Sequence, residues 1–594
     1  MSEVARRIED LIPAAEWLPS YGAPDLRGDL RAGLTVGVML IPQGMAYAVL
    51  AGLPPIYGLY ASLAPLVVYA VLGTSRHLAV GVNAPIMVIV AAGLTPLATA
   101  GSPEYVGLAV LLTAATGLLL VGMGAAQLGF VANLLSRPVI AGFTAAAALI
   151  ILFSQLGNLL GLELSRTQYI HVMVIEAWEG LGRASGLSVA MGAACIAALL
   201  AFRRWTRIFP GELTVLAVAT AATWLFGLGE QGVLLVGEVP AGLPPLAIPE
   251  LGLEEAGRLG TTVLALALVQ FMSVVSLGRV FSARYRYTID PNQELLAVGS
   301  ANLLGSLFQA IPVSGSFSRT AVNEQAGART PLANVFAAGL IGVTLLFLTP
   351  LFRYLPMPAL GAVIVVAAMG LIDVAELREL FRTKPSDGWV ALLTFASVLV
   401  VGIQEGILVG VVAAVVKILY RISRPYVAEL GHLPATRSFR SLDRFEEAEP
   451  LERILILRVE AGFSFFNAKF FREYVLEKSR TDTRIRAVIL DGLSINYLDT
   501  TAVDAMEEVV GTLREWGIEI HLTGLTGPVR DVVKRSGLGD FIGEDHFHIA
   551  PHYAVVDILE RWDEENGGTR LEDYWRSTQQ KIEEVEPTAE SRFI

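Results

Sequence analysis

Long apolar runs recur along the chain from about Leu30 to about Tyr420. Many of them approach the roughly 20 residues that a helix needs to cross the hydrocarbon core of a bilayer. Short polar or glycine-rich stretches separate the runs. The pattern predicts a polytopic, all-α membrane domain.

The pattern changes after Arg424. Short β-type runs, such as Arg453–Val459 and Ala487–Asp491, alternate with helical periodicity, as in Thr501–Trp516. This alternation predicts a small α/β domain with a mostly parallel sheet. The expected parts are an N-terminal segment at 1–28, a membrane domain at 29–424, a linker at 425–450, the α/β domain at 451–562 and an acidic, partly disordered tail at 563–594.

The first apolar run, Leu34–Leu50, is interrupted by Pro42-Gln43-Gly44. Two later runs contain helix-breaking residues, at Gly81–Pro85 and at Pro312–Ser316. Proline removes a backbone donor and glycine relaxes the chain, so we expect helices to stop there. Ser314 or Ser316 is a suitable N-cap for a helix that starts after the second break. One break lies in each half of the chain, as in inverted repeats that hold a substrate between two opposed half-helices.

A helix that begins inside the membrane points unbonded N–H groups and about half a positive charge at the bilayer centre. Arg319 follows the second break and adds a full charge. An intramembrane arginine costs about 3 kcal/mol on the lower estimates and usually has a function. These features predict a site for a small anion. The alternative is that Arg319 pairs with Glu324.

Composition and charge limit the classes of function. Of 594 residues, 54% are hydrophobic and 17% are charged, and the mean hydropathy is +0.57. The net charge of -12 argues against nucleic acid as a partner. A single cysteine, Cys195, argues against a disulfide and a cysteine-based metal site. No Walker A loop, nucleophile elbow or His/Cys ligand cluster is evident, so we expect no enzyme activity, no cofactor, and transport driven by gradients.

Basic residues are distributed unevenly between the loops. They cluster at Arg27/Arg31, Arg279–Arg286 and Lys417–Arg424, whereas the long loop Gly227–Gly257 has none. By the positive-inside rule, both termini are expected on the cytoplasmic side of the plasma (inner) membrane.

Three motifs stand out in the membrane domain: Pro42–Ala48 followed by Leu53–Tyr60, then Ile289–Glu294, then Ser314–Asn323. Together they resemble the sulfate permease (SulP) family of anion transporters, which also includes the motor protein prestin. The stretch Ala487–Ala502 resembles the STAS domain that such transporters carry. The resemblance covers about Arg27 to Leu559.

The resemblance implies fourteen transmembrane segments in two inverted seven-segment repeats, a core domain and a gate domain, and a homodimer. It also implies an anion site between the first, third and tenth segments. The residues at the matching positions are Gln43, Tyr47, Asn83, Ala84, Ser316, Phe317, Ser318 and Arg319. Gln43 and Ser318 are expected to donate hydrogen bonds, Tyr47 and Phe317 to form walls, and Arg319 to supply charge. The alternative for Gln43 and Tyr47 is helix packing.

The chain departs from the family pattern at two places. Proton-coupled members carry an acid on the eighth segment, where this chain has Ser273, so simple proton symport through that position is in doubt. The third-segment motif usually begins Gly-Pro, and here it reads Gly81-Val82-Asn83. In the STAS-like domain, Thr501 matches a phosphorylated position, which makes it a regulatory candidate. The alternative is that Thr501 opens a capping box with Asp504.

Three functions remain open. The first is secondary transport of a small anion, sulfate above all, with bicarbonate or a dicarboxylate as substitutes. The second is chloride/bicarbonate exchange, which agrees with Ser273. The third is a membrane signalling protein whose STAS domain is the active part and binds a regulatory protein. Membrane lipid is a partner in each case.

Overall fold

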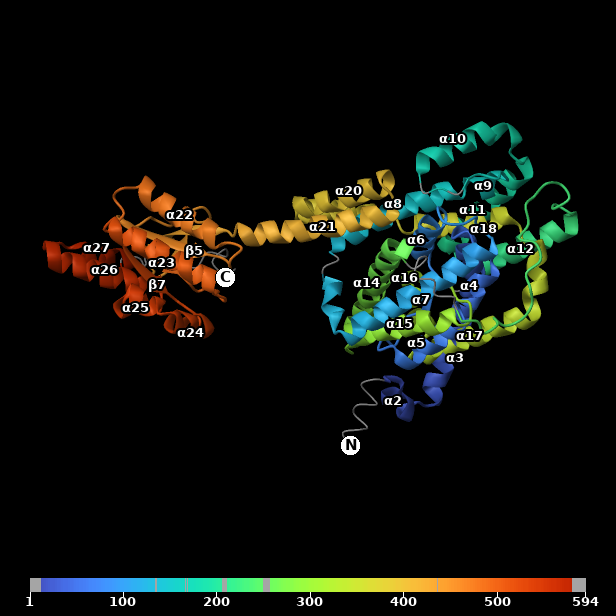
Figure 1. Ribbon diagram of the computed structural model, residues 1–594, viewed down its shortest axis with the longest axis horizontal. Coiled ribbons are helices and arrows are strands. Elements are labelled where there is room, and N and C mark those ends of the chain that lie inside the picture. The colour runs from blue at the N-terminus through green and yellow to red at the C-terminus, as the bar shows by residue number, and fades with distance from the viewer. Residues whose placement is uncertain are drawn as a thin grey trace. The chain divides into compact units, whose positions relative to one another are not determined.

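The computed structural model describes residues 12–133, 136–165, 167, 169–205, 211–248, 257–434 and 436–579 (Figure 1). The chain forms two compact units, Met1–Ala414 and Val415–Ile594. Residues 1–11 of the predicted N-terminal segment and 580–594 of the predicted acidic tail lie outside the described residues.

The first unit is built of helices. In the first half of the unit they are α3 (Ala23–Leu50), α4 (Ile56–Tyr60), α5 (Ala64–Leu72), α6 (Ala84–Leu94), α7 (Pro103–Ala125), α8 (Arg137–Ser154), α9 (Leu156–Leu160), α10 (Ile170–Gly180), α11 (Gly186–Trp205) and α12 (Gly211–Phe226). In the second half they are α14 (Gly260–Tyr285), α15 (Pro291–Ser306), α16 (Phe317–Ala326), α17 (Leu332–Val343), α18 (Met357–Met369), α19 (Val374–Thr383), α20 (Pro385–Val400) and α21 (Ile403–Ser423). Among the described residues, seven helices are long and apolar enough to cross a membrane, and the total of fourteen crossings stays a prediction.

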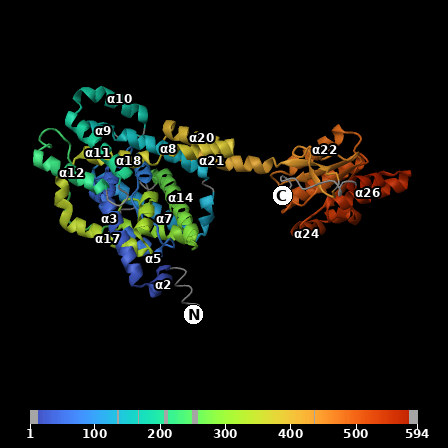
Figure 2. The same cartoon turned by 180° about the vertical axis from the view of Figure 1, so that it is seen from behind.

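The helices of this unit form two groups. In one group, α15 packs against α7 and α5, and α17 packs against α3 and α5. In the other, α20 packs against α8, and α18 packs against α8 and α11. Figures 1 and 2 show α7 and α14 together, and α8, α20 and α21 together, from both sides, and Figure 1 shows α15 beside α7. We call the first group, together with α6, α14 and α16, the core group, and the second group, together with α12 and α21, the gate group.

The helix α3 runs without a break through Pro42, whereas the apolar pattern indicated an interruption at Pro42-Gln43-Gly44. A transmembrane helix tolerates proline when neighbouring elements compensate for the lost hydrogen bond. Gly44 does not end the helix but allows α3 to pack closely against α4. A Cβ on Gly58 of α4 would lie 1.9 Å from the Gly44 carbonyl oxygen, so the two helices touch backbone to backbone.

The two expected breaks are present, and they pair with each other. Val80–Gly81 forms strand β1 and Ser314–Gly315 forms strand β2, and the two strands are antiparallel. The helix α6 begins at Ala84 and α16 begins at Phe317, each a few residues after its strand. Antiparallel strands bring the two short helices to the same place from opposite directions, as inverted repeats require.

The second unit contains a six-stranded sheet in the order β4-β3-β5-β6-β7-β8. The strands are β3 (Val427–His432), β4 (Phe439–Ser441), β5 (Ile454–Val459), β6 (Ala487–Asp491), β7 (Glu519–Thr523) and β8 (Phe547–His548). The pairs from β5 to β8 are parallel, as predicted, and β3 is antiparallel to both of its neighbours. The expected linker at 425–450 therefore contains two strands, because alternating residues such as Ala428 and Leu430 bury one face.

Helices cover both faces of this sheet. Leu455 and Leu457 pack with the helices α22 (Ala468–Thr481) and α23 (Thr500–Glu515), whereas Ile454 and Ile456 pack with α26 (Pro551–Asn566). The alternation follows the two-residue period of a strand. Beyond Trp562, α26 continues and α27 (Arg570–Gln579) follows, so the expected tail is helical over these residues. Tyr574 of α27 is buried against the same face.

Replacing Gly117 by alanine is expected to destabilise the core group. In α7, a Cβ on Gly117 would lie 2.6 Å from the Leu303 backbone nitrogen and 2.8 Å from the Gly299 oxygen, so α7 and α15 must separate. Overpacking of this kind costs about 1–3 kcal/mol. Thermal unfolding of the detergent-purified protein measures the effect. Gly107→Ala, on the same helix with open space around it, is the control. Equal midpoints for the two variants would contradict this packing.

Candidate anion site

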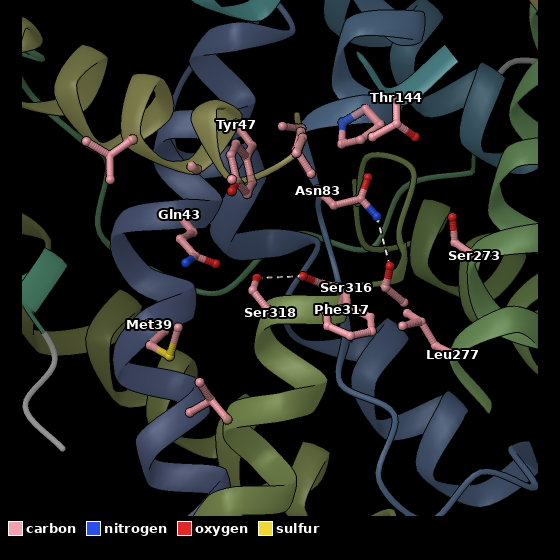
Figure 3. Close-up of a pocket in the computed structure, with 18 of the residues that line it drawn as sticks. Met39, Gln43, Tyr47, Asn83, Thr144, Ser273, Leu277, Ser316, Phe317 and Ser318 are labelled. Carbon is pink, nitrogen blue, oxygen red and sulfur yellow. Dashed lines mark hydrogen bonds between the residues drawn. The ribbon is translucent and has the colours of Figure 1, made fainter. Parts of the chain in front are cut away.

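A cavity of about 630 Å³ lies between the core and gate groups. Its core-group wall comes from α3, α14 and the starts of α6 and α16, and its gate-group wall comes from α8, α11, α12, α18 and α21. Figure 3 shows Gln43 and Tyr47 pointing from α3 toward Asn83 and the start of α16. The predicted site residues that line the cavity are Gln43, Tyr47, Asn83, Ala84, Ser273, Ser316, Phe317 and Ser318.

Asn83 joins the two half-helices. Its Oδ1 accepts a hydrogen bond from the Ile86 backbone nitrogen at 3.2 Å, which caps α6. Its Nδ2 donates to the Gly315 carbonyl at 3.0 Å, just before α16 begins. Pro85 has no N–H, so the Ala84 N–H is the donor of this first turn that has no acceptor among the described residues. One amide therefore caps one helix and positions the other.

The start of α16 offers more free donors. Ser316 occupies the N-cap position, and its carbonyl accepts from the Thr320 N–H at 2.9 Å. Its hydroxyl makes no cap bond and lies 3.3 Å from the Ser318 hydroxyl. Among the described residues, no acceptor bonds the backbone N–H groups of Phe317, Ser318 and Arg319. Free N–H groups at the positive end of a helix form a binding site for an anion.

Arg319 lies behind the start of α16 and does not line the cavity. Its side chain is fully buried, and Nη1 donates to Gln43 Oε1 at 3.2 Å. Its Nε and Nη2 have no hydrogen-bond partner among the described residues. A Cβ on Gly81 would lie 3.2 Å from Nη2, so glycine leaves room for the guanidinium there. The expected positive charge is therefore present, and Gln43, which lines the cavity, is the residue between it and the cavity.

The alternative pairing of Arg319 with Glu324 is wrong. Glu324 is bonded to Tyr285 and forms an ion pair with Arg284 at 3.3 Å. Residues 319 and 324 are five positions apart, so they lie on different faces of α16. Arg319 points toward α3, while Glu324 points toward the end of α14.

Glu212 is a further residue of the cavity wall that was not predicted from the sequence. This residue, at the start of α12, lines the cavity and accepts a hydrogen bond from Gln43 Nε2 at 2.8 Å. Gln43 thus joins a buried cation on one side to a carboxylate on the other, which fixes the orientation of its amide. An acid in the first turn of a helix is common for helix stability alone, so the sequence held no signal that placed Glu212 in the cavity.

Ser273 lies on the α14 wall of the cavity (Figure 3). Its hydroxyl donates to the Val269 carbonyl at 2.8 Å, one turn back along the same helix. The hydroxyl proton is thereby used within the helix, and the oxygen lone pairs remain for a partner in the cavity. This wall carries no carboxylate, which agrees with the departure noted at Ser273.

Comparison with known proteins identifies the family. The model of the sulfate permease family matches residues 26–394, and the STAS domain model matches residues 447–555. The chain belongs to the sulfate permease family. Its two units therefore correspond to a SulP transport domain and a STAS domain.

Full-length relatives and a solved structure agree with this. The chain is 35% identical over 555 residues to a probable sulfate transporter of Mycobacterium tuberculosis, covering 92% of this chain and 99% of the relative. It is 34% identical over 572 residues to the chloroplastic sulfate transporter 4.1 of Arabidopsis thaliana, covering 93% and 83%. The murine anion transporter Slc26a9 in the inward-facing state superposes with a TM-score of 0.86 at 25% identity, covering 93% and 94%.

Asn83→Asp is expected to keep the fold and lose anion binding. Aspartate caps a helix as well as asparagine does, but it loses the Nδ2 donor to Gly315 and places a negative charge beside the free N–H groups. Binding of labelled sulfate to the purified protein, with the thermal unfolding midpoint as a check on folding, measures the effect. Asn496→Asp, an exposed residue of the STAS domain, makes the same charge change away from the cavity. Unchanged sulfate binding by Asn83→Asp would contradict the assignment.

Proposed function

We propose that this protein is a secondary active transporter of a small oxyanion, with sulfate as its substrate. The observation that carries the proposal is the meeting of the starts of α6 and α16 at one cavity, with Arg319 buried behind them. An oxyanion between the two helix starts accepts hydrogen bonds from the Ala84 N–H on one side and from the α16 N–H groups on the other. The relatives that are named sulfate transporters support the choice of anion.

Transport in this proposal works by alternating access. The anion stays with the core group, which carries both helix starts, while the gate group supplies the opposite wall from α8, α12 and α18. Movement of one group against the other exposes the cavity to each side of the membrane in turn. The energy comes from ion gradients.

A second candidate, chloride/bicarbonate exchange, is favoured by one observation. Ser273 places no carboxylate on the α14 wall, and exchange of two anions needs no coupling proton. A signalling protein with a passive membrane anchor is disfavoured, because an anchor needs neither broken helices nor a buried arginine.

The chain is a multi-pass membrane protein. We further propose that it resides in the plasma membrane as a homodimer with both termini cytoplasmic. The positive-inside pattern supports the orientation.

Thr501 is proposed as a phosphorylation site through which a protein partner regulates the STAS domain. It is exposed in the first turn of α23, and Asp499 caps that helix by accepting from the Ala502 nitrogen at 2.9 Å. The capping box at Thr501 is therefore wrong, and the Thr501 hydroxyl is not needed as a cap.

Arg319→Ala is expected to lower sulfate uptake about tenfold or more. The substitution removes the positive charge behind the helix starts and the hydrogen bond from Arg319 to Gln43. Hydrogen bonds to a charged group contribute about 1.5–3 kcal/mol, and about 1.4 kcal/mol corresponds to a factor of ten. The measurement is uptake into proteoliposomes, with sulfate, bicarbonate and fumarate in competition. Arg284→Ala is the control, because Arg284 is 66% exposed and pairs with Glu324 outside the cavity. Normal uptake by well-folded Arg319→Ala protein would refute the proposed site.

Sulfate uptake is expected to depend weakly on an inward proton gradient, because Ser273 holds no coupling proton. Uptake at a series of outside pH values, with inside pH fixed, measures this dependence. Strong stimulation by acid would show that another group carries the proton. Glu212→Gln then tests the one carboxylate that we place in the cavity wall: loss of the stimulation in that variant would identify it.

A further inference from the structure

Three of the seven histidines of the chain gather at one edge of the STAS sheet. His521 lies in β7, His546 ends the short 3-10 helix η6 (Glu544–His546), and His548 lies in β8. In the β7–β8 pair, His548 is opposite Thr523. Paired residues share a face and alternate residues of a strand return to it, so His521 and His548 face the same side of the sheet.

Helix α26 covers this side of the sheet and adds charged groups to the cluster. Asp557 and Arg561 lie one turn apart on α26, with Arg561 Nη2 3.3 Å from Asp557 Oδ2. The same Nη2 is 3.3 Å from His521 Nε2. Two strands and one helix, distant in sequence, thus bring nitrogen and oxygen donors to one place.

Three of these side chains have the spacing of metal ligands. Nδ1 of His521 and Nε2 of His548 are 3.0 Å apart. One ligand atom from each of these histidines and from Asp557 lie within 4.8 Å of one another. Ligands on a tetrahedral zinc ion, with bonds of about 2.0–2.1 Å, have a similar separation. Two imidazole nitrogens this close must share a proton or a cation.

Glu519 lies on the other side of His521, where it can support His521 as a metal ligand. The His521 side chain is fully buried, and its Nε2 lies 3.4 Å from Glu519 Oε2. A carboxylate that accepts from the far nitrogen of a ligating histidine fixes the tautomer and raises the basicity of the ligand. Arg561 Nη1 is 3.0 Å from the same Glu519 oxygen and offsets its charge.

We propose that His521, His548 and Asp557 bind a divalent transition-metal ion, with Zn²⁺ as the best match, and that Glu519 is a positioning residue behind His521. Two nitrogens and one oxygen leave a coordination position open for water. The ion would tie β7 and β8 to α26. This site is independent of the proposed anion transport. Its residues spread over 519–557 with no compact spacing motif, so the site is not recognisable from residue spacing.

The same atoms also allow an arrangement without metal. Arg561 can donate to His521 Nε2, and the His521 Nδ1–H can then donate to His548 Nε2. In the proposed metal-bound form, the ion replaces this shared proton, and the His521 Nε2–H turns to Glu519.

Zinc content of the full-length protein tests the proposal. The protein is purified without a histidine tag, stripped with chelator, reloaded with Zn²⁺ and measured by isothermal titration and elemental analysis. We expect one tightly bound Zn²⁺ per chain. His548→Asn and Asp557→Asn should remove it, and Glu519→Gln should weaken binding about 10- to 100-fold. These residues are partly exposed, so the variants test binding without the risk of replacing fully buried His521.

His546→Ala is the matched control. Its ring lies 4.6 Å from that of His521, yet it is outside the proposed ligand set, so Zn²⁺ binding should persist. Loss of zinc in this variant with retention in His548→Asn would overturn the assignment, since the ion would then sit with Glu519 instead. Absence of stoichiometric zinc in the unmodified protein, or unchanged affinity in both His548→Asn and Asp557→Asn, would overturn the proposal altogether.

Discussion

Two short helices begin inside the membrane-spanning unit and direct their positive ends at one cavity. Other elements of the unit hold these two helix starts in place. The antiparallel pair β1–β2 holds the two chain breaks against each other, and Asn83 spans from the cap of α6 to Gly315. Unbonded N–H groups are unfavourable away from water unless a partner arrives. An anion is the partner that satisfies them and the helix dipoles together.

The buried charge of Arg319 is the second constraint on the cavity, because it must be compensated by negative charge nearby. Arg319 is fully buried, and the amide of Gln43 links it to the carboxylate of Glu212. A buried arginine needs compensating negative charge. In our proposal Glu212 supplies part of it from the gate group, and the transported anion supplies part of it from the cavity. Movement of the gate group would then change how strongly the core group holds its anion.

The sequence predicted the features that depend on local chemistry. Proline and glycine located both breaks, and short continuous apolar runs located β5 and β6. Features set by tertiary contact were missed. Pro42-Gln43-Gly44 resembled a break because proline and glycine usually end a helix. The contact of Gly44 with Gly58, which explains the glycine, is between two helices and cannot be read from one segment. Glu212 looked like an ordinary first-turn acid. Strands β3 and β4 lie in a polar stretch, and they are ordered because β3 pairs with β5 and β4 pairs with β3.

The most direct test of the account is the position of a bound anion. A cryo-electron microscopy map of the full-length protein in lipid nanodiscs, prepared with sulfate, would locate it. We predict density between the first turns of α6 and α16, within hydrogen-bonding distance of the Ala84 and Ser318 N–H groups and facing Gln43. An anion bound elsewhere, or α6 and α16 continuing unbroken through β1 and β2, would contradict the account.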